Sequence, residues 1–254
     1  MKLNEHTAVS TARTLLVPYD RRHVLTYHAW MEDPAIQEAT ASEPLTLEEE
    51  YENQESWRAS HDKLTFIICQ PPLSSSSSST SSPSPSSSSG RAIQAGEFDS
   101  PPKMMGDVNL FLYPDEEEGD EEDQPGIPKF CVGEVDIMIA DDENRGKGLG
   151  REAVRTFLKY VYERREEIMR EYAEDKDILP ARAPGLKMVM AKISQGNDKS
   201  LALFEKLGFE QEGEANYFGE VKLVLRDLGG FVWREEPEGY RELVYSRDPS
   251  SETP

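Results

Sequence analysis

The sequence predicts an α/β fold, with a central, mixed but mostly antiparallel sheet and helices on both of its faces. Three observations support this prediction. Short apolar segments alternate with amphipathic segments along the chain. One unit, residues 130–193, has the order strand, helix, strand, which is how parallel strands are connected. A basic, glycine-rich turn lies at the carboxyl end of the first strand of this unit, where ligands bind in open α/β sheets.

The amino-terminal part combines two strand patterns with two helical ones. The predicted elements are a strand at residues 14–18, helices at 21–31 and 47–60, and a strand at 63–69. The first helix places apolar residues at spacings of three and four. Thr46 is the expected N-cap of the second helix, and Glu49, three residues later, completes a capping box.

The carboxyl-terminal part contains most of the predicted sheet. Leu149, Ala153, Phe157 and Val161 are spaced four apart, which is typical of the buried face of a helix. Gly208 is expected to end a short helix in the left-handed conformation. The predicted elements are strands at 106–112 and 130–140, a helix at 148–172, a strand at 186–193, a helix at 200–207, and strands at 218–225 and 242–246.

Two segments of unusual composition interrupt what we interpret as a single domain of residues 1–248. The Ser/Pro-rich segment within residues 71–104 contains too few apolar groups to offset its ordering entropy, so we expect a disordered insertion. Residues 114–127 include an acidic run that is expected to repel itself and to remain solvated. Residues 249–254 are expected to form a flexible tail.

Composition argues against several classes of function. A net charge of −21 disfavours nucleic acid as a partner, because phosphate binding needs clustered basic residues. Two cysteines and four scattered histidines disfavour a metal site. No apolar run approaches the length of a membrane span, and no secretory leader is recognisable, so we expect no membrane partner and a cytoplasmic location.

The most distinctive segment is RGKGLGR at residues 145–151, between a strand pattern and a helix pattern. In such a turn, backbone N–H groups and the positive end of the following helix can converge on an anion. The spacing excludes two common phosphate motifs. A Walker loop needs four residues between its glycines, and a dinucleotide fingerprint starting at Gly146 would need a third glycine at Arg151. A different phosphate-bearing ligand is therefore expected.

The spacing Arg145-x-x-Gly148-x-Gly150 resembles the first signature of the GNAT superfamily of acyl-coenzyme A N-acyltransferases. The segments at residues 197–200 (NDKS) and 203–209 (LFEKLGF) are similar to its second signature. The resemblance implies a GNAT fold and acetyl-CoA as co-substrate, whose pyrophosphate the loop amides would hold and whose pantetheine would pair with the preceding strand. It implies that the cofactor-binding residues are Met138, Ile139, Ala140, Arg145, Gly146, Lys147, Gly148, Leu149, Gly150, Arg151, Asn197 and Ser200.

Five further segments resemble the N-acetyltransferase 9 subfamily, which lies in the ribosomal-protein N-terminal acetyltransferase-like branch. They are residues 1–5, 17–31, 40–51, 62–67 and 137–153. Nearly the whole chain is covered, apart from the two insertions. The resemblance implies transfer of an acetyl group from acetyl-CoA to a protein amino terminus, with tubulin as the associated substrate.

Acetyl transfer to an amine needs a general base, and one strand offers two candidates. Glu134 and Asp136 alternate with Val135 and Ile137, so both carboxylates lie on one face of the strand. If that face lines a cleft, the carboxylates can have raised pKa values and accept a proton near neutrality. We prefer Glu134 as the base, acting directly or through water. The alternative is that the face is simply exposed to solvent.

One residue departs from the family pattern. Many relatives have a tyrosine where this chain has Phe204, and that hydroxyl protonates the departing thiolate. Phenylalanine has no proton to donate, so another group such as Tyr217, or solvent, would have to do so. The departure keeps a second hypothesis open, in which the fold is a non-catalytic acetyl-CoA-binding or microtubule-associated scaffold.

The acceptor side is expected near the first two helices. In relatives this region lines the acceptor groove, which makes Tyr27, His28 and Glu43 candidate substrate contacts, with Glu43 meeting a substrate ammonium. Alternatively, Tyr27 and His28 are packing residues and Glu43 is a solvated turn residue. A third hypothesis for function is a small-molecule amine acetyltransferase, since an acidic chain would also suit small cationic acceptors.

Overall fold

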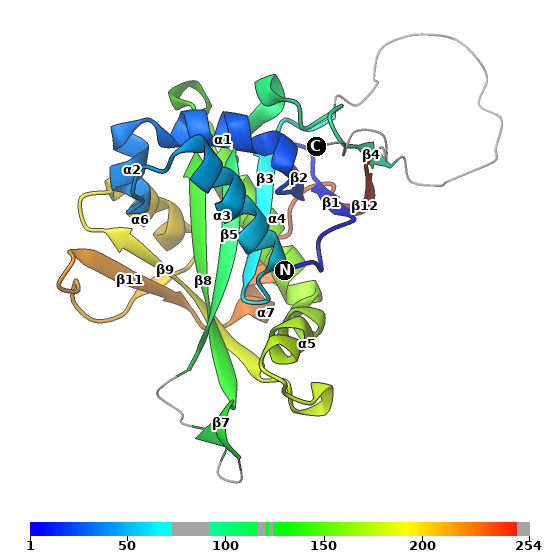
Figure 1. Ribbon diagram of the computed structural model, residues 1–254. Helices are drawn as coiled ribbons and strands as arrows, with labels where there is room; N and C mark the ends of the chain where they lie inside the picture. The colour runs from blue at the N-terminus through cyan, green and yellow to red at the C-terminus, as the bar shows by residue number, and fades with distance from the viewer. Residues whose placement is uncertain (73–91, 116–119, 122–123, 248–254) are drawn as a thin grey trace.

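The computed structural model describes residues 1–72, 92–115, 120–121 and 124–247 (Figure 1). Its centre is a mixed sheet whose neighbouring strands are antiparallel, except for the parallel pairs β8–β9 and β12–β4. The α/β fold class is therefore confirmed. The strands of this sheet lie in the order β10 (Glu210–Gln211), β11 (Glu220–Leu225), β9 (Gly185–Ser194), β8 (Phe130–Ile139), β5 (Met104–Pro114), β3 (Lys63–Cys69), β2 (Leu15–Pro18), β1 (Thr7–Ser10), β12 (Arg241–Ser246) and β4 (Ile93–Gln94).

Helices cover both faces of the sheet, as the sequence predicts. Figure 1 shows the first three helices together, in blue, on one side of the central strands. These are α1 (Val24–Met31), α2 (Pro34–Thr40) and α3 (Leu47–Ala59). The core on the opposite face is formed with α4 (Leu149–Glu163), α5 (Arg165–Asp175), α6 (Asp198–Lys206) and α7 (Leu228–Arg234).

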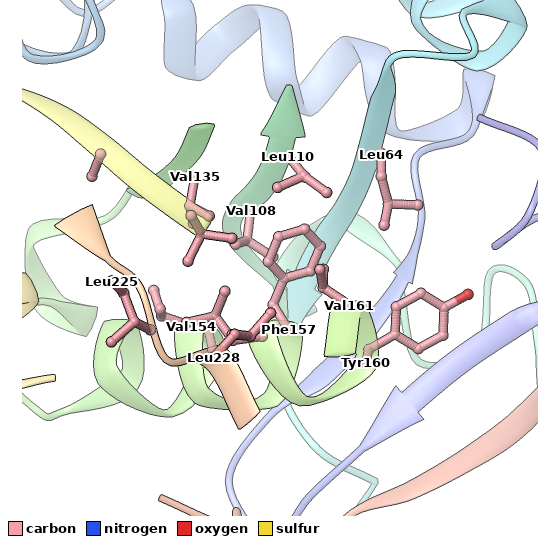
Figure 2. Packing of buried hydrophobic residues seen from close by; sticks show 14 of the residues in the cluster. Leu64, Val108, Leu110, Val135, Val154, Phe157, Tyr160, Val161, Leu225 and Leu228 are labelled. Atoms are coloured by element: carbon pink, nitrogen blue, oxygen red, sulfur yellow. The ribbon is translucent and has the colours of Figure 1, made fainter. Parts of the chain in front are cut away.

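The larger core forms where the apolar stripe of α4 meets alternate residues of β3, β5 and β8 (Figure 2). Phe157 of α4 is fully buried and packs edge-to-face on Phe66, with ring centroids 6.1 Å apart. The intervening residues of the same strands face α1 and α3, where Trp57 packs edge-to-face on Phe111. Strand alternation thus gives the sheet two faces with different partners.

Several predicted elements are confirmed. Strand 63–69 is β3, and the Thr46 capping box begins α3, with the Thr46 N–H donating to Glu49 Oε2 at 2.7 Å. The single helix predicted at 148–172 is wrong, because the structure has two helices separated at Arg164. The backbone of Arg164 leaves the helical region (φ −103°, ψ 10°), and its side chain bonds Glu242 of β12 at 2.6 Å.

Other elements were not predicted: β1, α2 and α7 are short, and their patterns are too brief to signal a helix or strand. The carboxyl end of the predicted insertion, residues 92–104, belongs to the fold. Asp99 there is buried and 2.9 Å from His23 Nε2, which ties this segment to the amino-terminal region.

The remaining predicted irregular segments are only partly described. Residues 73–91 of the Ser/Pro-rich segment and the tail at 249–254 lie outside the described residues. Within the acidic segment, the structure describes a short ladder between β6 (Asp120–Glu121) and β7 (Gln124–Pro128), and residues 116–119 and 122–123 are outside it.

The packing of α4 on the sheet gives a prediction about stability. Phe157→Ala should lower the free energy of unfolding by about 3–5 kcal/mol, because it opens a cavity at a fully buried position. Chemical denaturation monitored by circular dichroism would measure the change. Leu25→Ala is the control, since Leu25 is 60% exposed and its loss should change stability by less than about 0.5 kcal/mol. Equal effects of the two substitutions would contradict the assigned core.

Candidate active site

The sheet is interrupted between β8 and β9, which are parallel neighbours along the first part of their length. β8 and β9 pair from Phe130–Gly185 as far as Glu134–Met190, and the register ends there. Beyond that point β8 continues to pair with β5 and β9 continues to pair with β11. The strands therefore separate, and the carboxyl-terminal half of β8 has one edge without a neighbouring strand among the described residues.

A cleft occupies this separation. Its floor is the face of β5 and β8 that carries Asp107, Asn109, Glu134, Asp136 and Met138. The other walls come from α1, the end of α2 and the following turn, α3, β9, α6 and the start of β11. The residues that line them include Tyr27, residues 38–42, Trp57, Lys192, Ile193, Ser194, Asn197, Ser200, Phe204 and Glu220.

Strand geometry determines which backbone groups of β8 face the gap. The Ala140 N–H donates to Met105 O at 2.9 Å, on the β5 side. Because successive N–H groups of a regular strand point to opposite edges, those of Ile137 and Ile139 point toward the gap. Among the predicted pantetheine-pairing residues, Ile139 therefore directs its backbone N–H to the open edge, whereas the backbone N–H of Ala140 is already bonded to Met105 O.

The predicted phosphate loop follows directly after β8 and is held by its first residue. Arg145 donates from Nε to Ile139 O at 2.7 Å and from Nη2 to Ala140 O at 2.9 Å, and it is paired with Asp142. These contacts bring the loop back onto the end of its own strand. The guanidinium of Arg145 is therefore bonded to other groups of the protein, and through these bonds it positions the loop.

The end of the loop is the amino terminus of α4. Gly148 is the N-cap and adopts the left-handed conformation (φ 78°), which favours glycine, and no side chain caps the helix there. The first N–H groups of a helix have no intrahelical acceptor, and the helix dipole makes this end positive. The exposed Lys147 adds a cation beside it.

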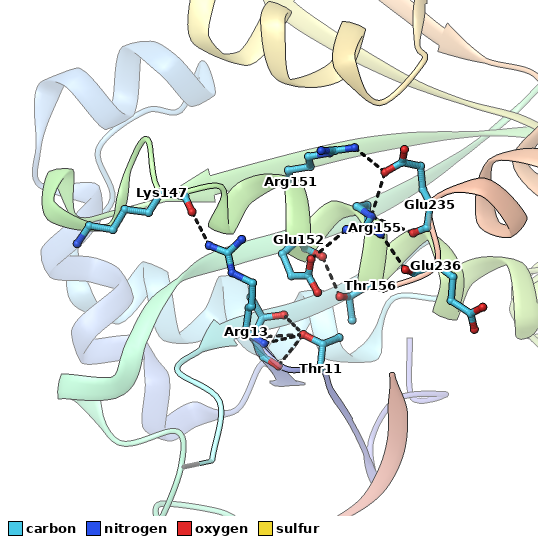
Figure 3. A network of polar contacts seen from close by, with 10 residues as sticks. Thr11, Arg13, Lys147, Arg151, Glu152, Arg155, Thr156, Glu235 and Glu236 are labelled. Atoms are coloured by element: carbon cyan, nitrogen blue, oxygen red, sulfur yellow. Dashed lines mark hydrogen bonds and ion pairs between the residues drawn. The ribbon is translucent and has the colours of Figure 1, made fainter. Parts of the chain in front are cut away.

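A further cation near the loop was not predicted from the sequence. Arg13, in the turn between β1 and β2, donates from Nη2 to Lys147 O at 2.5 Å (Figure 3). A methyl group added at Gly148 would lie 3.5 Å from Arg13 Nη1. The sequence does not predict this contact, because Arg13 and the loop are more than 130 residues apart and the fold brings the β1–β2 turn to the loop.

Ion pairs fix α4 in place behind the loop (Figure 3). Arg151 bonds Glu235 at 2.8 Å, so its charge is partly neutralised. Arg155 pairs with the same carboxylate at 3.1 Å and with Glu152 at 3.2 Å. Because Glu235 follows α7, these contacts connect the start of α4 to the carboxyl-terminal part of the fold.

The second predicted motif lies on the opposite wall. Asn197 caps α6, with its Oδ1 accepting from the Ser200 N–H at 3.2 Å, and both residues line the cleft. Phe204, one turn later, is buried and also lines the cleft, packed on Phe209 with ring centroids 5.0 Å apart. Tyr217 is 97% exposed and is not among the residues that line the cleft.

The two candidate bases have different surroundings. Glu134 forms an ion pair with Lys192, with Oε2 and Nζ 2.7 Å apart. Asp136 makes no ion pair with a described residue, and its side chain is accessible from the cleft. Asp136 is exposed to the cleft, but the surrounding walls reduce its hydration; this desolvation, followed by repulsion from Glu134, raises the pKa of Asp136 to about 7.

A third carboxylate on this face was not predicted. Asp107 is 2% exposed and accepts from Asn109 Nδ2 at 2.7 Å and from the Tyr27 hydroxyl at 3.5 Å. Burial raises the pKa of Asp107 to about 6. Asp107 and Asn109 lie in the strand predicted at 106–112. Their period-two spacing with Phe111 was the sequence signal that these side chains share one face of the strand.

The predicted acceptor residues divide into two groups. Tyr27 lines the cleft, as expected. His28 and Glu43 do not, and the acidic residue on that side of the cleft is Glu38. His28 is partly buried on α1, and Glu43 is exposed in the turn before α3.

None of the described helices is both long and apolar enough to cross a membrane. No group of three or more potential metal ligands occurs within the part of the chain that the structure describes.

Comparison with known proteins identifies relatives over most of the chain. The family profile "Acetyltransferase (GNAT) domain" matches residues 13–210. An N-acetyltransferase 9-like protein of Schizosaccharomyces pombe is 38% identical over 237 residues, covering 89% of this chain and 98% of the relative. The alpha/beta-tubulin-N-acetyltransferase 9 of Homo sapiens is 35% identical over 260 residues, covering 99% of both chains.

Solved structures share the fold at lower sequence identity. A spermidine N-acetyltransferase chimera derived in part from Vibrio cholerae superimposes with a TM-score of 0.52 at 14% identity, covering 87% of this chain and 99% of the other. An acetyltransferase (GNAT family) from Bacillus anthracis gives 0.51 at 12% identity, with 87% and 98% covered. At these identities the similarity concerns the fold.

The electrostatics of the cleft give a prediction that does not depend on activity. Glu134→Gln should lower the pKa of Asp136 below about 7, because it removes a neighbouring negative charge and releases the Lys192 ammonium. Carbon-13 NMR titration of the aspartate carboxyl carbons would measure it. Glu32→Gln, an exposed residue after α1, is the control and should leave the titration unchanged. An Asp136 titration that does not move in Glu134→Gln would contradict the described arrangement.

Proposed function

Because the chain belongs to the GNAT family of acetyltransferases, we propose that it transfers an acetyl group from acetyl-CoA to the amino-terminal amine of a protein. The family confirms the resemblance found in the glycine-rich loop and establishes the enzyme class, an acetyl-CoA-dependent N-acyltransferase. The finer elements of the proposal are the residues that hold the two substrates, the general base and the kind of acceptor.

The separated edge of β8 supports the proposed position of acetyl-CoA, which supplies the acetyl group as a thioester. The uncapped N–H groups at the start of α4, together with Lys147 and Arg13, would hold its phosphates. The free N–H group of Ile139 would pair with its pantetheine arm and direct it into the cleft. Gly146 and Gly150 would allow the close approach of the backbone.

The same open edge can stabilise charge during the reaction. As the amine attacks, negative charge develops on the acetyl oxygen, and a fixed N–H donor lowers the barrier most when it is already in place. The backbone N–H of Ile137 is our candidate for this donor, because it lies beside Asp136 and points toward the gap.

Asp136 is the general base that we propose. A base works best when its pKa lies near the operating pH, and the pKa of Asp136 is about 7. Glu134, the base preferred from sequence alone, is engaged by Lys192 at 2.7 Å. In this proposal its role is to raise the pKa of Asp136, and the Glu134–Lys192 pair keeps that negative charge in place.

The departing thiolate needs a proton that Phe204 cannot supply. Ser200 lines the same wall one turn before Phe204, and its hydroxyl makes no hydrogen bond with a described residue. Ser200 or cleft water is therefore the proposed donor. The solvent-facing side chain of Tyr217 argues against the tyrosine considered from the sequence.

Two observations favour a protein acceptor. Relatives from human, Drosophila melanogaster and mouse are named alpha/beta-tubulin-N-acetyltransferase 9. The cleft is bounded by the turn after α2 on one side and by β9 and β11 on the other, and it remains open to the surface between them. We therefore propose a polypeptide amino terminus, with tubulin as the first candidate and the cytoplasm as the place of action.

The proposed base can be tested through the pH dependence of acetylation. With a panel of short peptides of varied amino termini and radiolabelled acetyl-CoA, kcat/KM should rise about tenfold per pH unit below about 7 and level off above it, because Asp136 must be ionised. Asp136→Asn should lower the rate by about 10²–10⁴-fold and remove this dependence.

The matched variant is Glu134→Gln, which should keep the rise and plateau of this pH profile and move it toward lower pH. A wild-type protein that labels polyamines but no peptide would support the small-molecule alternative. A wild-type protein that binds acetyl-CoA and labels neither would support a non-catalytic scaffold.

The proposed phosphate site can be tested by calorimetry. Arg13→Ala should weaken acetyl-CoA binding about tenfold to a hundredfold, the effect of losing one charge-assisted contact, and it should affect desulfo-pantetheine analogues without phosphates far less. Arg21→Ala is the control, because Arg21 is an exposed arginine paired with Glu55 on a distant helix. Unchanged binding in Arg13→Ala would remove Arg13 from the site.

A further inference from the structure

The floor of the cleft contains an arrangement of acceptors that acetyl-CoA binding does not explain. Asn109 of β5 and Asp136 of β8 are directly opposite each other in the antiparallel register, and Asp107 lies two residues along β5 on the same face. Opposite residues have Cβ atoms about 5 Å apart, and diagonal neighbours about 7–8 Å. Three side chains with acceptor oxygens therefore surround one point of the cleft.

The Asp107 carboxylate is buried without a positive partner. It is 2% exposed, its hydrogen bonds come from the neutral Asn109 amide and Tyr27 hydroxyl, and no ion pair joins it to a described residue. Lys192, the cation that lines the cleft, pairs with Glu134 instead. A buried charge without a counter-charge is unfavourable, so this position favours a cationic ligand.

Asn109 adds a second, independent observation. Its side chain is 5% exposed and lines the cleft, and its Nδ2 is directed to Asp107. The Oδ1 atom is buried and has no hydrogen-bond partner among the described residues. Buried polar atoms are nearly always bonded, and an oxygen of this kind needs a ligand that donates a hydrogen.

We propose that Asp107, Asn109 and Asp136 form a recognition site for the primary ammonium group of the acceptor. This inference rests on the proposed function and specifies its substrate chemistry. A primary ammonium carries one positive charge and three N–H donors, which match two carboxylates and one amide oxygen. The acceptor binds in its charged form, and Asp136 then takes the proton before the amine attacks.

The proposal has a consequence for stability, because an empty site keeps the Asp107 charge uncompensated. Burial raises the pKa of Asp107 above its unfolded value, so the folded state binds its proton more tightly. Ionisation of Asp107 therefore costs stability as the pH rises from about 4 to about 6, and that cost remains at neutral pH. Asp107→Asn should raise the melting temperature of the free protein, which a merely structural hydrogen bond would not do.

The direct test uses small cations on the intact protein. Butylammonium should raise the melting temperature of the wild-type protein, whereas butyltrimethylammonium, with the same charge and no N–H donor, should have little effect. In Asn109→Leu, the butylammonium concentration needed for the same rise in melting temperature should be about tenfold higher or more, because the variant lacks an acceptor for a charged donor. Asp107→Asn should weaken it as well.

Thr65→Val is the matched control. Thr65 lies opposite Asn109 on β3, and its Oγ1 is also buried and without a partner, but it does not line the cleft. This variant should respond to butylammonium like the wild type. An equal response to both cations, or an unchanged response in Asn109→Leu, would overturn the proposed site.

Kinetics separate this inference from the proposed function. With the best peptide of the acceptor panel, Asn109→Leu should raise the KM for peptide and leave the KM for acetyl-CoA unchanged. If the wild type acetylates peptides and Asn109→Leu has a normal peptide KM, the ammonium site is wrong and the acetyltransferase proposal stands. If the wild type acetylates no amine, but butylammonium raises its melting temperature and butyltrimethylammonium does not, the ammonium site stands and the acetyltransferase proposal is wrong.

Discussion

The proposed function of this fold depends on the point where β8 and β9 cease to pair. Up to Glu134 the two strands are neighbours in a continuous sheet, and beyond it each keeps only its outer partner. The loss of backbone hydrogen bonds along this edge is unfavourable unless other donors and acceptors replace them. An extended ligand arm lying along β8 could do so, which is why we propose the gap as the binding feature of the sheet.

The surrounding structure holds the gap open. α4 packs through Phe157 and its neighbours against the far face of β5 and β8, while Arg155 and Glu235 fasten its start to the carboxyl-terminal region. The loop at the end of β8 is drawn back by Arg145. A rigid strand, a fixed helix terminus and a short loop therefore place the uncapped N–H groups at the end of the open edge.

The sequence predicted the parts of this arrangement that depend on local patterns. Strand 63–69, the Thr46 capping box and the loop at residues 145–151 all have short-range signals, and the structure has the corresponding elements. It could not predict Arg13 beside the loop or the pairing of Glu134 with Lys192, because both contacts depend on distant segments. The interruption of the β8–β9 register has no signal in composition or periodicity.

The same separation explains why different charges meet in one cleft. Cationic groups gather at the end of β8, where Arg13, Lys147 and the start of α4 lie. Carboxylates gather on the floor, and Asp136 precedes the end of β8 by three residues, about 10 Å along the strand. An anionic co-substrate and a cationic acceptor would be attracted to opposite ends of this gradient, so the field itself would orient both toward the middle of β8. In the proposed mechanism Asp136, whose pKa is about 7, lies at that meeting point and takes the proton that must leave before the new bond can form.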